Sequence, residues 1–223
     1  QGGKQMSRSF ERTRTWIFDL DNTLYPASAR IFDQINRLMT AFIQDKVGVS
    51  GQDADHLRRD LWMRHGTTMA GLAAEHGIEP EDFLEACHVL DLSVLSPDPD
   101  LSAALQSLPG RRIVHTNGPR ANAERIVAAR GLATCFEQII AIEDTGLVSK
   151  PTAEAYARAR DLSGHTHEHA VMIEDHADNL RVPRALGMTT VWLDPDMGSE
   201  QPDHVDHRIS ALTPFLQDLA RRR

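Results

Sequence analysis

The chain has 223 residues, of which 41% are hydrophobic and 25% charged, and its formal net charge is −8. This composition is typical of a soluble globular protein with one core and a modest second lobe. The acidic balance argues against a nucleic-acid-binding surface, and no apolar run approaches the roughly 20 residues of a membrane helix. The polar N-terminal stretch is unlike a secretory signal, and Cys87 and Cys135 lack the spacing of a zinc site. We therefore expect a cytoplasmic protein with no nucleic acid or membrane partner.

Five short apolar runs lack the polar alternation of half-exposed strands, which is typical of strands buried on both faces of a parallel sheet. Helical patterns separate the later runs, and Gly131 and Gly187 stand where helix C-caps belong. This alternation predicts an α/β fold with a doubly wound parallel sheet. The expected strands cover residues 15–18, 112–116, 137–142, 169–173 and 189–193, and the expected helices cover 100–107, 120–130, 152–162 and 177–186.

Residues 28–93 contain no good strand, and we expect them to form an inserted group of helices. The first helical pattern spaces its apolar residues along one face: Ile31, Ile35, Leu38, Phe42 and Ile43. Further helical patterns cover residues 53–66, 68–77 and 80–90. The Pro-rich segment 96–100 is typical of a hinge. We therefore expect an α/β core formed by residues 10–27 and 94–223 and an α-helical cap formed by residues 28–93, placed to act as a lid.

Polar side chains follow the predicted strands, at the sheet edge where doubly wound folds bind ligands. They are Asp19 and Asp21, Thr116 and Asn117, Lys150, and Glu174 and Asp175. Each of them alone is explained as a turn residue, a helix cap or a solvated side chain. Together they place several acids, a hydroxyl and a lysine at one edge. Clustered carboxylates need a cation, and oxygen ligands suit Mg²⁺.

This set of side chains has the chemistry of phosphoryl transfer. Asp19 can act as a nucleophile, because carboxylates form aspartyl-phosphate intermediates. Asp21, one strand pitch further on, is expected to face the same side, where it can protonate the leaving oxygen and later take a proton from water. Thr116 and Lys150 can hold the phosphoryl oxygens. We therefore predict Asp19, Asp21, Thr116 and Lys150 as catalytic residues.

Four motifs, in order, resemble those of the haloacid dehalogenase superfamily of phosphatases, from about residue 14 to about residue 195. They are DLDNT (from Asp19), HTNG (with Thr116), VSKP (with Lys150) and IEDHADN (with Glu174 and Asp175). The resemblance implies a Rossmann-like core with a small α-helical cap. It also implies that Asp19, the main-chain carbonyl of Asp21, and Asp175 bind the metal, with Asp178 and Asn179 where some members place a further acid. Dehalogenases of the superfamily lack the second acid of the first motif, so Asp21 favours phosphoryl transfer.

Finer cues resemble the pyrimidine 5′-nucleotidase-like branch of this superfamily. They are FDLDNTLYP, RHGTTMAGL (64–72), LSPDPDL (95–101) and TNGPRANAERI (116–126). The resemblance implies a Mg²⁺-dependent phosphomonoester hydrolase acting on pyrimidine nucleoside 5′-monophosphates. We predict that Thr116, Asn117 and Lys150 bind the substrate.

The cap segment around His65, Thr67 and Thr68 has two interpretations. This Gly-containing turn can contact the leaving group, which would make all three residues substrate-binding, or it can be a helix–helix turn capped by threonine. Trp62 and Met63 are expected in the cap core or at the cap–core interface. The alternating histidines of HTHEH (165–169) are expected as exposed loop and strand residues rather than as a metal site.

Two other functions stay open at this point. One is a phosphatase or mutase for another small phosphometabolite, such as a sugar phosphate; a trapped bisphosphate intermediate would identify a mutase. The other is a non-catalytic protein that uses the fold to bind a ligand. The full motif set disfavours the latter, because binding alone needs no second acid at position 21. A monomer or a small homo-oligomer is compatible with the sequence.

Overall fold

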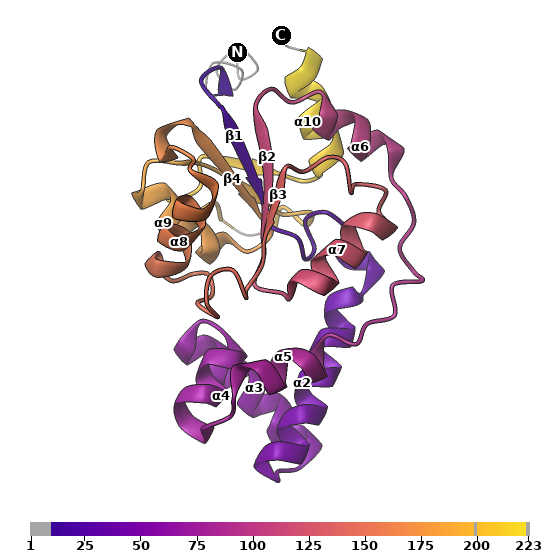
Figure 1. Ribbon diagram of the computed structural model, residues 1–223, viewed down its shortest axis with the longest axis vertical. Coiled ribbons are helices and arrows are strands. Elements are labelled where there is room, and N and C mark those ends of the chain that lie inside the picture. The colour runs from indigo at the N-terminus through magenta and orange to yellow at the C-terminus, as the bar shows by residue number, and fades with distance from the viewer. Residues whose placement is uncertain (1–9, 199, 222–223) are drawn as a thin grey trace.

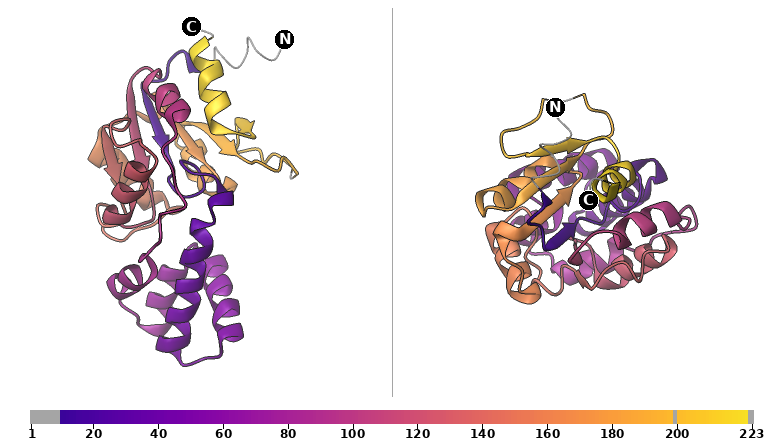
Figure 2. Two further views of the ribbon diagram at one scale, coloured as in Figure 1. Left: turned by 90° about the vertical axis from the view of Figure 1, so that its right-hand side faces the viewer. Right: turned by 90° about the horizontal axis from the view of Figure 1, so that it is seen from above.

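The computed structural model describes residues 10–198 and 200–221, and within them the core is a parallel sheet of six strands in the order β3-β2-β1-β4-β5-β6. Helices cover both faces of this sheet (Figures 1 and 2), which confirms the predicted doubly wound α/β fold. The strands are β1 (Thr15–Phe18), β2 (Arg111–His115), β3 (Gln138–Ile140), β4 (Ala170–Glu174), β5 (Thr189–Leu193) and β6 (His207–Ile209).

The centre of the sheet is the pair β1 and β4, in which every residue is buried. The two strands run parallel with Phe18 opposite Ile173. Alternate residues point to opposite faces, so Phe18 and Ile173 pack into one hydrophobic cluster and Ile17 and Met172 into another. Strands β2 and β3 extend the sheet on one side of this pair and β5 and β6 on the other. The order therefore reverses between β1 and β4, where open α/β sheets form their ligand crevice.

Helices α8 (Ala153–Ser163) and α9 (Arg181–Ala185) lie on one face of the sheet, and α6 (Pro99–Gln106), α7 (Arg120–Ala129) and α10 (Leu212–Arg221) lie on the other (Figures 1 and 2). Short 3₁₀ segments occur at η1 (Ala27–Ala29), η2 (His167–His169) and η3 (Ala177–Leu180).

Two elements differ from the sequence-based expectation. The single helix expected over residues 177–186 is split into η3 and α9. Pro183 explains the split, because in the middle of one long helix it would lack an N–H to donate and would clash with the carbonyl of residue 179. The pattern also does not predict β6, because only Ile209 in this strand is buried.

Four helices lie between β1 and α6 in the sequence: α2 (Ile31–Val47), α3 (Gly51–His65), α4 (Thr68–His76) and α5 (Pro80–Cys87). They form one group beside the sheet (Figure 1). Gly66 and Gly77 end α3 and α4 in the left-handed conformation, as their positions predict. The group has its own hydrophobic cluster, which includes Leu61, Leu72 and Phe83. We refer to α2–α5 as the helical insert.

Arg130, at the end of α7, links both connections between the insert and the sheet. Its buried guanidinium donates to the main-chain carbonyls of Leu24 (3.2 Å) and Ser96 (2.6 Å), and it pairs with the Asp98 carboxylate at 2.7 Å. Leu24 precedes the insert and Ser96 follows it. The Arg130 side chain therefore holds both of the segments that connect the insert to the sheet.

In the described part of the chain, no helix combines the length and the apolar character needed to cross a membrane. Cys87 and Cys135 are buried free thiols. Residues 1–9, which make up most of the polar N-terminal stretch, lie outside the described residues.

Candidate active site

The carboxylates of Asp19, Glu174 and Asp175 meet at the carboxyl ends of β1 and β4. The main-chain N–H of Asp19 donates to the carbonyl of Ile173 at 2.9 Å, which continues the ladder and brings Asp19 beside Glu174. One oxygen of each carboxylate lies within 4.8 Å of the others. Burial raises the pKa of Glu174 and of Asp175, and the charge of Asp19 adds to both shifts. This cluster therefore needs a compensating positive charge.

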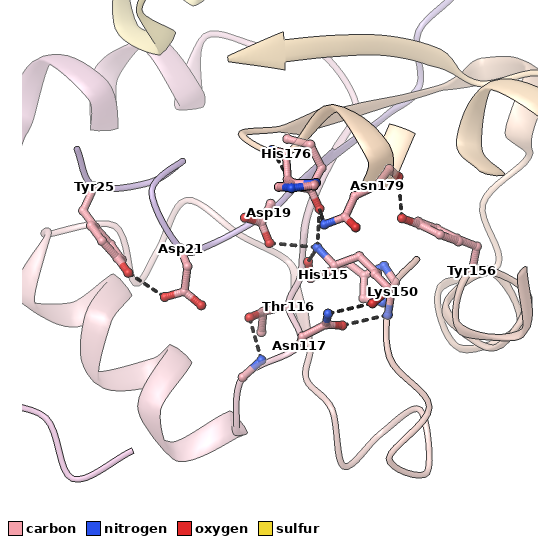
Figure 3. Close-up of polar contacts among 12 residues, drawn as sticks. Asp19, Asp21, Tyr25, His115, Thr116, Asn117, Lys150, Tyr156, His176 and Asn179 are labelled. Carbon is pink, nitrogen blue, oxygen red and sulfur yellow. Dashed lines mark hydrogen bonds and ion pairs between the residues drawn. The ribbon is translucent and has the colours of Figure 1, made fainter. Parts of the chain in front are cut away.

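Lys150 supplies part of that charge (Figure 3). Its fully buried Nζ donates to Asp19 Oδ1 at 2.8 Å, to Glu174 Oε1 at 2.6 Å and to the carbonyl of His115 at 2.8 Å. Burial alone would lower the pKa of Lys150, but the charges of Asp19 and Glu174 outweigh it and the net shift is upward. All three ammonium protons are used, so Lys150 is a charged and rigidly held group.

Asn117 holds the main chain of Lys150 (Figure 3). The Asn117 side-chain amide donates to the Lys150 carbonyl at 3.0 Å, and its oxygen accepts from the Lys150 N–H at 2.8 Å. The amide that we expected to contact substrate is thus paired with Lys150. This geometry favours a positioning role for the Asn117 side chain.

The Thr116 hydroxyl faces the same space as Asp21. Thr116 follows β2, is buried, and accepts a hydrogen bond from the Gly118 N–H at 3.0 Å. A Cβ atom added to Gly118 would lie 3.4 Å from Thr116 Oγ1 and 3.9 Å from Asp21 Oδ2. Glycine at 118 therefore keeps open the space beside the hydroxyl and the carboxylate.

Asp21 lies in a different environment from Asp19. Strand β1 ends at Phe18, so a turn, rather than strand alternation, places Asp21. Its Oδ1 accepts a 2.6 Å hydrogen bond from the buried Tyr25 hydroxyl. Burial, with the charge of Asp19, raises the pKa of Asp21 to about 6, although the Tyr25 hydrogen bond acts in the opposite direction. Sequence reasoning missed Tyr25, because nothing in the pattern indicates which way its hydroxyl points.

Asn179 and Glu174 support Lys150 through consecutive hydrogen bonds. Asn179 Nδ2 donates to Glu174 Oε1 at 3.1 Å, and the Asn179 carbonyl accepts a 2.5 Å hydrogen bond from Tyr156. Asp178 instead pairs with Arg181 at the exposed surface, at 2.9 Å. Asn179 thus belongs to the site, while Asp178 lies outside the carboxylate cluster.

The structure brings one of the three predicted cap residues to the core. Thr67 caps α4 by accepting from the Ala70 N–H, and its hydroxyl lies 3.4 Å from Ser149 Oγ, next to Lys150. His65 contacts Glu75 of α4 at 2.6 Å, and Thr68 donates to a main-chain carbonyl of α3. The hydroxyl of Thr68 and the ring of His65 are therefore engaged within the insert.

The histidine-rich segment lies at the opposite edge of the sheet, because η2 directly precedes the amino end of β4. His165 is buried and contacts Ser163 Oγ at 2.7 Å, so the expectation that it is exposed was wrong. Its ring lies 5.1 Å from that of His167. Within the described residues, the cluster of three potential metal ligands is the acidic one at Asp19, not this segment.

The donor set at the carboxyl edge suits Mg²⁺, which prefers oxygen ligands and few protein carboxylates. Glu174 Oε1 is already bonded to Lys150 and Asn179. Asp19 and Asp175 remain as the carboxylates that could hold the ion. Burial, with repulsion from Asp19 and Glu174, raises the pKa of Asp175, and a divalent cation would offset both effects.

Known proteins resemble this chain over nearly its whole length. It is 25% identical to "Phosphate metabolism protein 8" of Saccharomyces cerevisiae, over 92% of this chain and 70% of the relative, and 24% identical to "Glyceraldehyde 3-phosphate phosphatase" of Methanopyrus kandleri, over 92% and 97%. Among solved structures, the HAD phosphatase from Thermococcus onnurineus superimposes with a TM-score of 0.62 at 20% identity, covering 94% of this chain and 97% of that one. L-2-haloacid dehalogenase from Xanthobacter autotrophicus has a TM-score of 0.55 at 18% identity, with coverage of 94% and 97%.

The family model for haloacid dehalogenase-like hydrolases matches residues 13–187. That span includes β1, the helical insert, and the loops that carry Asp19, Thr116, Lys150 and Asp175. The carboxylate cluster and its buried lysine thus lie in the matched region, and the chain belongs to the haloacid dehalogenase-like hydrolases.

Proposed function

We propose that this protein is a Mg²⁺-dependent phosphomonoester hydrolase that forms an aspartyl-phosphate on Asp19. The proposal rests on the different environments of two carboxylates, those of Asp19 and Asp21. Asp19 is held by Lys150, which donates to its Oδ1 at 2.8 Å, whereas burial, with the charge of Asp19, raises the pKa of Asp21 to about 6. Environments that separate two neighbouring carboxylates in this way mark a division into nucleophile and acid.

In the first half-reaction, an oxygen of Asp19 attacks phosphorus and the bond from phosphorus to the leaving oxygen breaks. Asp21 gives its proton to that leaving oxygen through Oδ2, because Tyr25 holds Oδ1. The Thr116 hydroxyl donates to a phosphoryl oxygen, and the positive charge of Lys150 offsets the negative charge of the phosphoryl group. Mg²⁺, when held by Asp19, Asp175 and the main-chain carbonyl of Asp21, supplies positive charge that offsets the charge of the phosphoryl group.

In the second half-reaction, Asp21 accepts a proton from a water molecule that attacks phosphorus. The bond between Asp19 and phosphorus breaks, which releases phosphate and restores the Asp19 carboxylate. A group with a pKa near neutrality can give and take a proton in turn. The raised pKa of Asp21 therefore supports both of its roles.

The substrates that we propose are nucleoside 5′-monophosphates, pyrimidine ones first. The motif resemblance to the pyrimidine 5′-nucleotidase-like branch supports this choice. We further propose that residues 28–93 act as the cap, with Thr67 as its contact beside Lys150.

A second candidate is a phosphatase for a compact sugar phosphate. It is favoured by the relative named "Glyceraldehyde 3-phosphate phosphatase", which this chain matches over 97% of the relative's length. Both candidates use the same residues and the same chemistry, so they differ in the leaving group alone.

Phosphate release from a panel of substrates tests this proposal. The panel contains 5′-mononucleotides, sugar phosphates and other phosphometabolites, each with Mg²⁺ and with a chelator. Asp19→Asn serves as the blank. We expect Mg²⁺-dependent release from uridine or cytidine 5′-monophosphate. Release from sugar phosphates alone would retain the mechanism and replace the substrate, and release that survives Asp19→Asn would overturn the mechanism.

A further inference from the structure

Trp62 in the last turn of α3 is a large aromatic side chain left 43% exposed, whereas Trp16 and Trp192 are buried. Its ring meets the ring of His176 edge to face, with centroids 5.3 Å apart and an interplanar angle of 88°. His176 directly follows Asp175, and its main-chain N–H points to Glu174 at 3.5 Å. An aromatic side chain of the helical insert therefore contacts the loop that carries the carboxylate cluster.

The turn that follows Trp62 contacts the other side of the site. A Cβ added to Gly66 would lie 3.1 Å from the ring of Pro151, and the Thr67 hydroxyl lies 3.4 Å from Ser149 Oγ. The end of α3 thus meets both the loop after β4 and the segment that presents Lys150. Trp62 makes the first of these contacts, through His176, which directly follows Asp175.

Packing of the insert does not account for this tryptophan. Among the described residues, the buried cluster of the insert is formed by other side chains, including Leu61 on the same helix. Large apolar side chains that stay exposed beside a polar site are typical of a surface that binds a ligand.

We infer that Trp62, in edge-to-face contact with His176, is the residue against which the leaving group of the substrate lies, and that it selects phosphomonoesters whose leaving group carries a planar aromatic ring, as a nucleoside does. This inference rests on the proposed phosphatase function. An indole face attracts other aromatic rings, and stacking a base on an aromatic side chain contributes about 1–3 kcal/mol as measured by alanine substitution. A compact leaving group would gain little from the same surface.

Two substrates that differ in the base alone test this inference. Uridine 5′-monophosphate and ribose 5-phosphate carry the same phosphoester on the same sugar, but the second lacks the base. We expect Trp62→Ala to lower kcat/KM for uridine 5′-monophosphate by about 10-fold, chiefly through KM, because one stacked base is lost. Turnover of ribose 5-phosphate should stay nearly unchanged. Trp62→Phe should recover much of the loss, and Met63→Ala, the matched control one residue further on, should change neither substrate.

Equal loss on both substrates would overturn the inference, because it would mean that Trp62 only positions the insert. No loss on either would overturn it as well. If the wild-type protein hydrolyses neither substrate, a binding measurement still tests the inference. In the Asp19→Asn variant, uridine 5′-monophosphate should quench the tryptophan fluorescence. Adding Trp62→Phe to that variant should abolish the quenching. Quenching without turnover would contradict the proposed hydrolysis and support Trp62 as the binding surface. The absence of quenching would contradict the role of Trp62 itself.

Discussion

The Tyr25 hydroxyl donates a 2.6 Å hydrogen bond to Oδ1 of Asp21, four residues earlier in the chain. Both side chains belong to the turn after β1, and Tyr25 is buried. The bond fixes the rotation of the Asp21 carboxylate, so that Oδ2 faces Gly118 and the Thr116 hydroxyl. The orientation of Asp21, the proposed acid, thus depends on Tyr25, which lies outside the DLDNT motif.

Replacing Tyr25 with phenylalanine should lower kcat about 10-fold and leave KM nearly unchanged, because a hydrogen bond to a charged or reacting group is lost at the cost of about 1.5–3 kcal/mol. Steady-state kinetics on the best phosphomonoester of the panel measures this. Tyr156→Phe is the matched control, because Tyr156 donates to the main-chain carbonyl of Asn179 instead. Equal effects of the two variants on kcat would contradict the positioning role of Tyr25.

Excess Mg²⁺ should raise the thermal unfolding midpoint of the protein, since an ion at 100 times its Kd stabilises the folded state by about 2.7 kcal/mol. Asp175→Asn should abolish this rise. Without Mg²⁺ the same variant should be at least as stable as the wild type, because it removes a partly buried carboxylate that Asp19 and Glu174 repel.

The matched control for the Mg²⁺ experiment is Asp178→Asn. Asp178 lies three residues further on but pairs with Arg181 at the surface. Its substitution should leave the stabilisation by Mg²⁺ intact. If Mg²⁺ stabilised Asp175→Asn as much as the wild type, Asp175 would not be a ligand.

The contribution of His165 to stability should fall as the pH drops from about 6.5 toward 4. Burial, with the nearby charges of His167, Arg111 and Arg160, lowers the pKa of this histidine to about 4. Below its ordinary value of 6.5 the unfolded chain binds a proton that the folded protein does not, so acid favours unfolding.

His165→Gln should therefore remove this contribution, so that the free energy of unfolding rises less, or falls more, between pH 4 and pH 6.5 than in the wild type. Urea unfolding at several pH values measures this slope. His56→Gln, at an exposed position, is the control. If the two variants had the same slope as the wild type, His165 would not be responsible for the acid sensitivity.

Arg130→Ala should lower the free energy of unfolding by about 2–3 kcal/mol, because it leaves the Leu24 and Ser96 carbonyls without their donor and Asp98 without its partner. Urea denaturation measures the change. Arg160→Ala, which removes an exposed ion pair with Asp161, should cost less than about 1 kcal/mol. Similar losses for both variants would show that Arg130 does not secure the insert.

The sequence was sufficient to predict the doubly wound sheet and the meeting of the polar residues at its edge. Asp19, Thr116 and Asp175 each come soon after a buried strand, and parallel strands end at one edge. Lys150 was predicted as part of the same set, and its VSKP motif fits the family resemblance, although it lies in a loop well beyond β3. That Lys150 donates to both Asp19 and Glu174 depends on contacts across 131 and 24 residues of sequence.

The remaining features depend on the directions in which side chains point, which the hydrophobic periodicity of the sequence does not predict. The roles of Tyr25 and Trp62 depend on which partner each ring meets, Asp21 in the first case and His176 in the second. His165 is buried in the loop between α8 and η2, beside Ser163, so strand alternation does not apply to it. Short-range pattern therefore predicts most of the elements, with β6 and the split between η3 and α9 as exceptions, and long-range packing decides which side chains support the site.

Mass spectrometry of rapidly quenched enzyme tests the central claim most directly. The wild-type protein is mixed with Mg²⁺ and its best phosphomonoester, quenched in acid during turnover and digested. We predict the mass of one added phosphoryl group on the peptide that contains Asp19, and none on that peptide in Asp19→Asn. Full turnover with an unmodified Asp19 peptide, or a phosphoryl group on another residue, would contradict the proposed role of Asp19.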